Sequence, residues 1–438
     1  MSTPLNILQA WSIPDIQKRL KFLIFALLIF VLGAHIPTPG ISATLIAQFF
    51  GESGAGGGGL FGLLNLFTGG AMSKFSILAL GVMPYINASI LMQILVAVEP
   101  KLKELQQEGE EGRKRISKIT RYLAIVFAFM QGFGLIFAIH GGSFVSPDYP
   151  FPMSVMAPLT ALLVVVAGTC FLMWLGDEIT EKGIGNGISL IIFIGIVARV
   201  PQMLAQELQQ ARFESSRLVA ILLFGVFLVL IVTGIVFIQL AVRKIPIQYA
   251  RRQVGRKIYG GQSTYLPIKV ALAGVIPIIF AVSVLIIPQT VLKFFPQAYG
   301  AQVLWAGFEN GFWYPLTNWM LTFVFTFIYT AITFNTKDIT DNLRKHGGFI
   351  PGIRPGKPTF DFLDKVLHRV TFFGAVFLAT VAILPIIVNQ VVFEISQVNV
   401  TVFYIGGTSL LIVVGVALDT VQQLQAHMVM RHYSGFTR

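Results

Sequence analysis

Residues 218–242 read LVAILLFGVFLVLIVTGIVFIQLAV, a run of 25 residues without a charged side chain. A helix needs roughly 17 to 25 mostly apolar residues to cross the ~30 Å hydrocarbon core of a bilayer. This run is long enough to cross as one helix, and charged residues, Arg217 and Arg243, flank it. The stretch therefore predicts an integral membrane protein.

The composition of the whole chain agrees with this prediction. Of 438 residues, 55% are apolar and 12% are charged, and the mean hydropathy is +0.75. That charged share is about half of what a soluble domain carries, and disordered chains have the opposite composition. A single cysteine, Cys170, excludes an internal disulfide, and no Cys/His cluster has metal-ligand spacing. We expect no cofactor and no metal.

Nine further stretches have the length and hydropathy of a membrane span. The ten candidates lie near 20–36, 75–97, 122–140, 153–175, 184–199, 218–242, 268–292, 314–334, 370–392 and 399–418. The first follows Lys18, Arg19 and Lys21 like a signal peptide, but no cleavage site follows it, so we interpret it as a span. Ten spans divide into two inverted halves of five helices, 1–200 and 201–438. The predicted fold is all-α.

The net charge of +12 is distributed unevenly between the two sides of these spans. When loops are assigned to alternate sides, 27 of the 32 Lys and Arg fall on one side and 5 on the other. Because cytoplasmic loops carry the excess of cations, both termini are predicted to be cytoplasmic.

Most of the spans lack ionisable side chains. Eight of the ten have a core without Asp, Glu, Lys, Arg or His: 75–98, 122–139, 153–176, 218–242, 270–292, 312–334, 370–393 and 395–418. Ion-coupled transporters and intramembrane acid–base enzymes need such groups at depth, so both classes are disfavoured. A secondary transporter that binds its substrate through unwound backbone carbonyls remains the alternative. The apolar centre is either a packed bundle core or a hydrophobic constriction.

A short apolar segment, 60–67, lies between glycine-rich stretches in the loop from Gly54 to Lys74. Eight helical residues measure about 12 Å, which is less than half the hydrocarbon thickness, so this segment does not span. It is either a re-entrant helix enclosed by protein, with the glycines as hinges, or a helix in the membrane interface.

Two long cytoplasmic loops, 243–269 and 335–369, carry seven cations each. Alternating Ile245, Ile247 and Tyr249 predict a β-hairpin in the first loop. In the second loop, prolines and glycines hold Arg354 on a stiff turn. Such loops are usually only topogenic, but two projecting basic loops favour an anionic partner: rRNA, an acidic ATPase surface or lipid headgroups.

Seven segments together resemble the SecY family, the channel subunits of bacterial and plastid protein translocons. They are IPTPG at 36–40, GVMPYINASI at 81–90, FLMWLG at 171–176 with GIGNGIS at 183–189, the hairpin 249–259, QSTYLP at 262–267, PGIRPG at 351–356 and GGTSLLI at 406–412. They occur in the family's order and cover nearly the whole chain. The resemblance implies an hourglass of two inverted five-helix halves with a re-entrant plug at about 60–70.

The resemblance also implies roles for individual residues. The apolar ring at the waist would be Val82, Ile86, Ile188, Ile192, Ile279 and Ile412, with Val82 where isoleucine is usual. The plug would include Leu60, Phe61, Leu63, Leu64, Leu66 and Phe67. The lateral gate would open beside Asn87, Gln93 and Ile287. Lys244, Arg251, Arg252, Arg256, Lys257 and Arg354 would dock a partner.

These roles imply a protein-conducting channel and its partners. The expected partners are SecE- and SecG-type small membrane subunits, the SecA motor ATPase, the ribosome, secretory preproteins and anionic lipid. Because the partners supply the driving force, the chain itself is not expected to be an enzyme. The expected location is the bacterial inner membrane or the thylakoid membrane.

Overall fold

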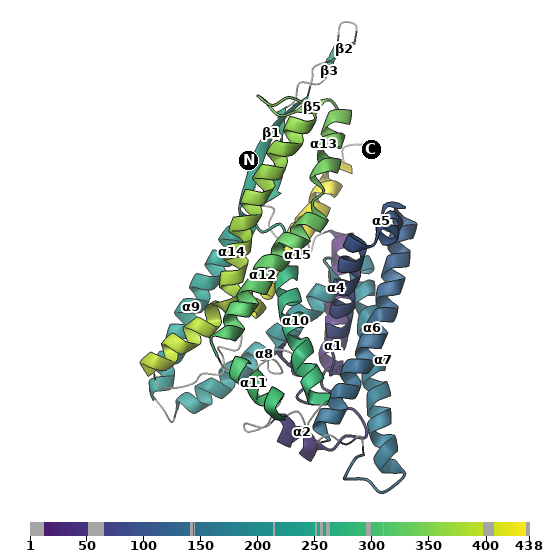
Figure 1. The fold of residues 1–438 in the computed structure, drawn as a ribbon, viewed down its shortest axis with the longest axis vertical. Helices are drawn as coiled ribbons and strands as arrows, with labels where there is room; N and C mark the ends of the chain where they lie inside the picture. The colour runs from purple at the N-terminus through teal and green to yellow at the C-terminus, as the bar shows by residue number, and fades with distance from the viewer. Residues whose placement is uncertain are drawn as a thin grey trace.

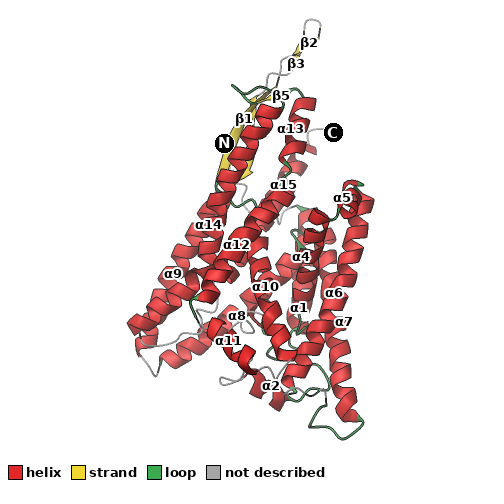
Figure 2. Cartoon of the chain, viewed as in Figure 1, coloured by secondary structure: helices red, strands yellow, loops and turns green. Residues whose placement is uncertain are grey.

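The structure is a computed structural model, and it is mainly helical (Figure 2). It describes residues 13–50, 65–140, 143, 145–212, 215–249, 252–254, 257–259, 263–294, 299–309, 311–396 and 407–434. Seven helices in this part of the chain are long and apolar enough to cross a membrane. They are α6 (Glu110–Ile139), α7 (Met153–Lys182), α8 (Gly187–Ala211), α9 (Ser215–Leu240), α12 (Trp313–Thr333), α14 (Lys357–Ser396) and α15 (Gly407–Ser434).

Three other predicted spans coincide with helices that are shorter or more charged. They are α1 (Pro14–Gly33), α4 (Met83–Val98) and α10 (Ile276–Phe294). The N-terminal half of α1 carries Asp15, Lys18, Arg19 and Lys21, and α4 has only 16 residues. Every predicted span thus contains a helix, although within the described residues seven helices have the full length and hydropathy expected of a span.

The predicted start of the second span was wrong, because residues 71–82 form turns and α4 begins only at Met83. Positive φ angles at Phe75 and Gly81 keep this segment out of a helix. Its backbone groups are paired instead with the segment after α1: Ile77 N–H donates to Ile36 O at 3.0 Å, and Thr38 N–H donates to Phe75 O at 2.9 Å. Irregular backbone inside a membrane bundle is tolerated when its polar groups are paired in this way.

Two other predicted boundaries also differ. The seventh span was expected from 268, but strand β4 (Ser263–Lys269) and turns at 270–275 precede α10. The fifth span was expected to end at 199, whereas α8 continues to Ala211. Residues 200–211, which follow the predicted span, are therefore helical.

The predicted hairpin is confirmed at one end of the molecule (Figure 1). Strand β1 (Val242–Tyr249) pairs antiparallel with β4, and β2 (Arg252–Val254) pairs with β3 (Lys257–Tyr259). A short strand from the second basic loop, β5 (Gly348–Phe349), adds to the other side of β1.

The remaining short helices divide between the two ends of the bundle. Helices α5 (Pro100–Gln107) and α13 (Thr336–Lys345) lie at the hairpin end in Figure 1, whereas α2 (Ala43–Phe50) and α11 (Tyr299–Glu309) lie at the opposite end. This arrangement agrees with the alternation of loops that the charge distribution predicts.

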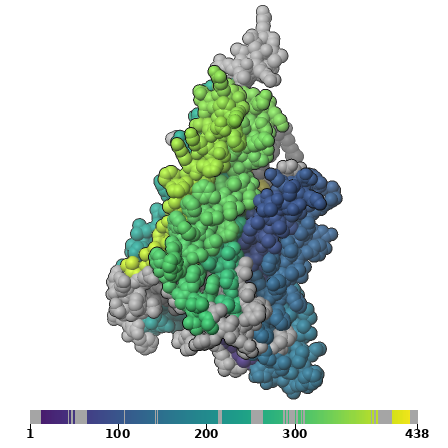
Figure 3. Space-filling view, in the orientation of Figure 1, coloured from purple at the N-terminus to yellow at the C-terminus, as the bar shows by residue number. Residues whose placement is uncertain are grey.

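The apolar core consists of a central cluster and one further large cluster in each half of the chain. One peripheral cluster includes Phe75, Ile136 and Leu162, and the other includes Leu378 and Leu411. In Figure 3 the blue surface of α5–α7 and the green surface of α12–α14 lie on opposite sides of the molecule. The central cluster joins helices from both halves, and it contains the candidate site.

Candidate functional site

The six residues predicted to form the apolar ring meet in the central cluster. Val82, Ile86, Ile192 and Ile412 are at most 8% exposed, and Ile188 and Ile279 are partly buried beside them. They come from the start of α4, from α8, from α10 and from α15. Side chains more than 300 residues apart in the sequence are thus brought together where the two halves meet.

Local helix geometry explains why these side chains converge. Val82 and Ile86 are four residues apart, and Ile86 N–H donates to Val82 O at 3.1 Å, so their side chains share one face. Ile188 and Ile192 have the same spacing on α8. A glycine on α7, Gly176, allows this end of α8 to approach, because a Cβ there would lie 2.9 Å from Ile188 Cγ1.

The structure describes only one end of the predicted plug. Leu66 and Phe67 are buried and belong to the central cluster, whereas Leu60, Phe61, Leu63 and Leu64 lie outside the described residues. The described end packs on α8: a Cβ at Gly195 would lie 2.8 Å from Phe67 O. This end of the segment is enclosed by protein.

A compact set of hydrogen bonds follows Phe67. Ser73 N–H donates to Asn65 Oδ1 at 2.9 Å, and Gly70 N–H donates to Asn65 O at 2.8 Å. Gly69 and Gly70 both have positive φ, which glycine adopts without a Cβ penalty. These two glycines, expected to act as hinges, lie in a hydrogen-bonded turn.

The two helices predicted to border the lateral gate, α4 and α10, are in contact. On α4, Gln93 Nε2 donates to Ser89 Oγ at 3.2 Å, and Asn87 Oδ1 is buried without a hydrogen bond from the described residues. On the opposite face of α10, the Phe280 ring meets Phe325 of α12 edge-on, with centroids 5.9 Å apart. Ile287 lies on α10, but its side chain is outside the described part of the structure.

The predicted docking residues gather at the hairpin end. Lys244 is exposed on β1, and Arg252 and Lys257 lie on the paired strands β2 and β3. Arg251 and Arg256 lie outside the described residues.

The turn that carries Arg354 is exposed and is held by local hydrogen bonds. Ile353 N–H donates to Ile350 O at 3.0 Å, and Thr359 Oγ1 donates to Arg354 O at 2.8 Å. Strand β5 connects this turn to the hairpin through the pairs Gln248↔Phe349 and Tyr249↔Gly348, a link that the sequence did not predict. The two basic loops therefore form one sheet-linked surface.

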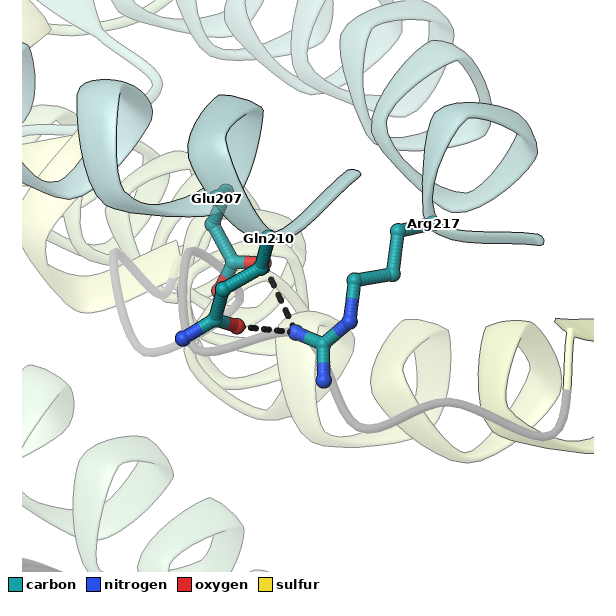
Figure 4. A network of polar contacts seen from close by, with 3 residues as sticks. All are labelled: Glu207, Gln210 and Arg217. Carbon is teal, nitrogen blue, oxygen red and sulfur yellow. Dashed lines mark hydrogen bonds and ion pairs between the residues drawn. The ribbon is translucent and has the colours of Figure 1, made fainter. Parts of the chain in front are cut away.

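A buried polar contact joins α8 to α9 at the other end of the molecule. Glu207 is 1% exposed, and its Oε2 lies 3.4 Å from Arg217 Nη1. The same guanidinium nitrogen donates to Gln210 Oε1, and Figure 4 shows Arg217 reaching both residues from the start of α9. This contact could not be predicted from the sequence, because 200–217 has the composition of a polar loop.

These features define a class of protein. Helices of both halves meet in a buried apolar cluster, an irregular element packs beside it, and a basic hairpin projects from one end of the bundle. This is the architecture of a helical membrane channel.

The comparisons identify the family. The SecY family model matches residues 76–421, and the chain belongs to the SecY family. Protein translocase subunit SecY of Thermotoga maritima is 45% identical over 435 residues, covering 98% of this chain and 96% of that protein. The same subunit of Pseudomonas aeruginosa is 41% identical over 445 residues, covering 99% and 96%.

Solved structures share the fold at lower identity. A structure described as that of a protein-conducting channel superposes with a TM-score of 0.65 at 17% identity, covering 98% of both chains. One of a SecY protein, whose title states that the plug domain stabilises the closed state and maintains a membrane seal, has a TM-score of 0.61 at 17% identity and 98% coverage of both. Sec61 in a canine ribosome–channel complex has a TM-score of 0.58 at 16% identity, again covering 98% of both. The protein is a protein-conducting translocation channel.

Proposed function

We propose that the translocating chain passes through the ring of Val82, Ile86, Ile188, Ile192, Ile279 and Ile412. The single observation that carries this proposal is the meeting of all six side chains in one buried cluster made by both halves. Apolar walls exclude water and therefore stop small ions, whereas a translocating polypeptide displaces the apolar side chains and passes between them. The ring thus combines protein passage with an ion seal.

The segment that ends at Leu66 and Phe67 serves as the plug. Burial of these two side chains beside the ring supports a re-entrant arrangement over an interfacial one. The related SecY structure, whose title assigns a sealing role to its plug domain, supports the same function here. In the resting channel the plug adds a second barrier next to the ring.

The contact between α4 and α10 serves as the lateral gate, through which transmembrane segments pass into the bilayer. Both helices are preceded by apolar turns, at 71–82 and 270–275, and each helix corresponds to the second predicted span of its half. Interrupted segments at corresponding positions of two inverted halves are typical of the functional pathway in such folds. Asn87 and Gln93 would line this gate with polar groups.

The sheet-linked basic surface docks the driving partner. Candidate residues are Lys244, Arg251, Arg252, Arg256, Lys257 and Arg354, and candidate partners are the SecA motor ATPase, the ribosome and anionic lipid. The complex of Sec61 with a ribosome supports the ribosome as one partner.

The partners supply the driving force, and the chain itself has no enzymatic role. SecE- and SecG-type subunits complete the channel for secretory preproteins. It lies in the bacterial inner membrane or a thylakoid membrane, with both termini cytoplasmic. The alternative, a secondary transporter, is not favoured by membership of the SecY family.

Hydration of the ring provides the test. Replacing Ile86, Ile192 and Ile412 together by Asn is expected to raise resting ion conductance in planar bilayers, because polar walls remove the dewetting barrier. The matched control replaces the same three residues by Leu, which keeps the walls apolar and the channel closed. Equal conductance in the Asn and Leu variants would contradict the assignment of the ring.

A further inference from the structure

Six residues, 270–275, join the basic hairpin to the helix that carries Ile279. They form turns between β4 and α10, and Ala271 and Ala273 are buried. At the hairpin end, Val270 N–H donates to Ala241 O at 2.9 Å, which ties the turn to the end of α9. Any displacement of the hairpin therefore reaches α10 through a short element with two buried residues.

Two glycines from neighbouring helices allow the turn to lie where it does. A Cβ at Gly374 of α14 would lie 2.4 Å from Val270 O, and one at Gly415 of α15 would lie 2.9 Å from Val275 Cγ2. Both distances are too short for any side chain unless a neighbour moves. The contact at Gly374 is with the backbone of the turn, whereas the closest contact at Gly415 is with the Val275 side chain. A smaller residue at position 275 therefore relieves only the contact at Gly415.

The contact at Gly415 lies one helical turn from the ring. Ile412 precedes Gly415 by three residues on α15, and Ile279 follows Val275 by four residues on α10, so each pair shares a helix face. Both isoleucines belong to the central cluster, and Val275 packs against it. Val275 and Gly415 thus lie one helical turn from Ile279 and Ile412, respectively.

We infer that the turn 270–275 couples the basic hairpin to the ring, with Gly374 and Gly415 as the positioning residues that seat it. This inference rests on the proposed roles of the ring and the hairpin. A partner that displaces the hairpin moves the turn against α15 and separates Ile279 from Ile412. In the resting channel, the close packing of the turn on Gly374 and Gly415 holds Ile279 and Ile412 together.

The first experiment measures resting ion conductance in planar bilayers and needs no partner. Gly415→Ala is expected to raise it about tenfold, the factor that corresponds to about 1.4 kcal/mol and lies within the usual range for overpacking. Adding Val275→Ala is expected to restore the wild-type value, because it removes the closest group, Val275 Cγ2, while the other neighbour of the new Cβ, Gln239 Nε2 at 3.1 Å, is the end of a flexible side chain that can move aside. The control is Gly225→Ala on α9, where a Cβ meets nothing within 4 Å. Conductance of Gly415→Ala equal to that of the control, or no restoration by Val275→Ala, would overturn the inference.

The second experiment compares two states of one folded protein. Val275→Cys and Gly415→Cys, in a Cys170→Ser background, place two thiols at the seat. Oxidation is expected to lock the turn onto α15, leave resting conductance low and stop SecA-driven import of a secretory precursor into vesicles, and reduction is expected to restore import. Failure of the thiols to cross-link, or equal import in both states, would contradict the coupling.

The two experiments also separate this inference from the proposed function. If SecA does not drive import through the unsubstituted channel, the docking proposal fails, while the conductance test of the seat still applies. If the unsubstituted channel imports normally but Gly415→Ala conducts ions no better than Gly225→Ala, only the coupling is wrong. The proposed roles of the ring and the hairpin then still hold.

Discussion

Gly168 on α7 determines the path of the irregular segment before α4. A Cβ at this position would lie 1.8 Å from Ile77 O, which is far inside any real contact. The carbonyl belongs to a segment whose neighbouring N–H groups pair with the chain after α1. One missing methyl group therefore allows non-helical backbone to lie against a membrane helix next to the ring.

Gly168→Ala is expected to destabilise the protein by about 3 kcal/mol, the upper part of the usual range for overpacking, because the new Cβ meets backbone instead of a movable side chain. The measurement is the unfolding midpoint in detergent. The matched control is Gly234→Ala on α9, where a Cβ meets nothing within 4 Å. A midpoint for Gly168→Ala equal to that of the control would mean that the segment before α4 is not held as described.

At the scale of elements, hydropathy predicted the existence of helices better than their starts. The turns at 71–82 and 270–275 are as apolar as the helices that follow, so a hydropathy window does not separate them. Gly81 and Gly274 have positive φ, but the sequence alone does not reveal which glycines do. The end of α8 was missed for the opposite reason, since Arg199 and Glu207 resemble loop residues until their packing is known.

The turn at 351–356 carries Arg354, which was predicted to dock a partner. Arg354→Glu is expected to abolish most SecA-driven import while leaving topology intact, because the other cations on the same side of the spans still orient the chain. A charge-assisted hydrogen bond contributes about 1.5 to 3 kcal/mol, so reversing the charge weakens docking by at least tenfold. Import into vesicles is measured together with protease accessibility of the loops.

Lys365→Glu, which makes the same change of charge on α14, serves as the control for Arg354→Glu. Normal import by both variants would mean that the turn at 351–356 is only topogenic.

At the scale of the whole molecule, the sequence predicted which residues meet only through the resemblance to SecY. Periodicity places Val82 and Ile86 on one face, but nothing local connects them to Ile412, more than 300 residues away. That contact depends on how two half-bundles pack, which a hydropathy pattern does not encode. The same applies to the pairing of β5 with β1, which unites two basic loops that are separate in the sequence.

The junction between the halves is a whole-molecule feature that the sequence did not predict. The division of the chain was expected at residue 200, but α8 crosses that point and ends at Ala211, and α9 begins at Ser215. Glu207 and Arg217 form an ion pair across this junction, with the carboxylate buried and the guanidinium group one-fifth exposed. Removing one partner of a buried ion pair is costly, because the other charge stays desolvated.

Arg217→Ala is therefore expected to lower the free energy of unfolding by roughly 3 kcal/mol, the low end for a broken buried pair because Arg217 is partly exposed. Adding Glu207→Gln is expected to recover part of the loss, since a neutral amide needs no cation beside it. Arg212→Ala, which removes an exposed cation from the same junction, should change stability by no more than about 0.5 kcal/mol. Unfolding midpoints in detergent compare the three variants. If Arg217→Ala is no less stable than Arg212→Ala, the ion pair does not hold the two halves together at this junction.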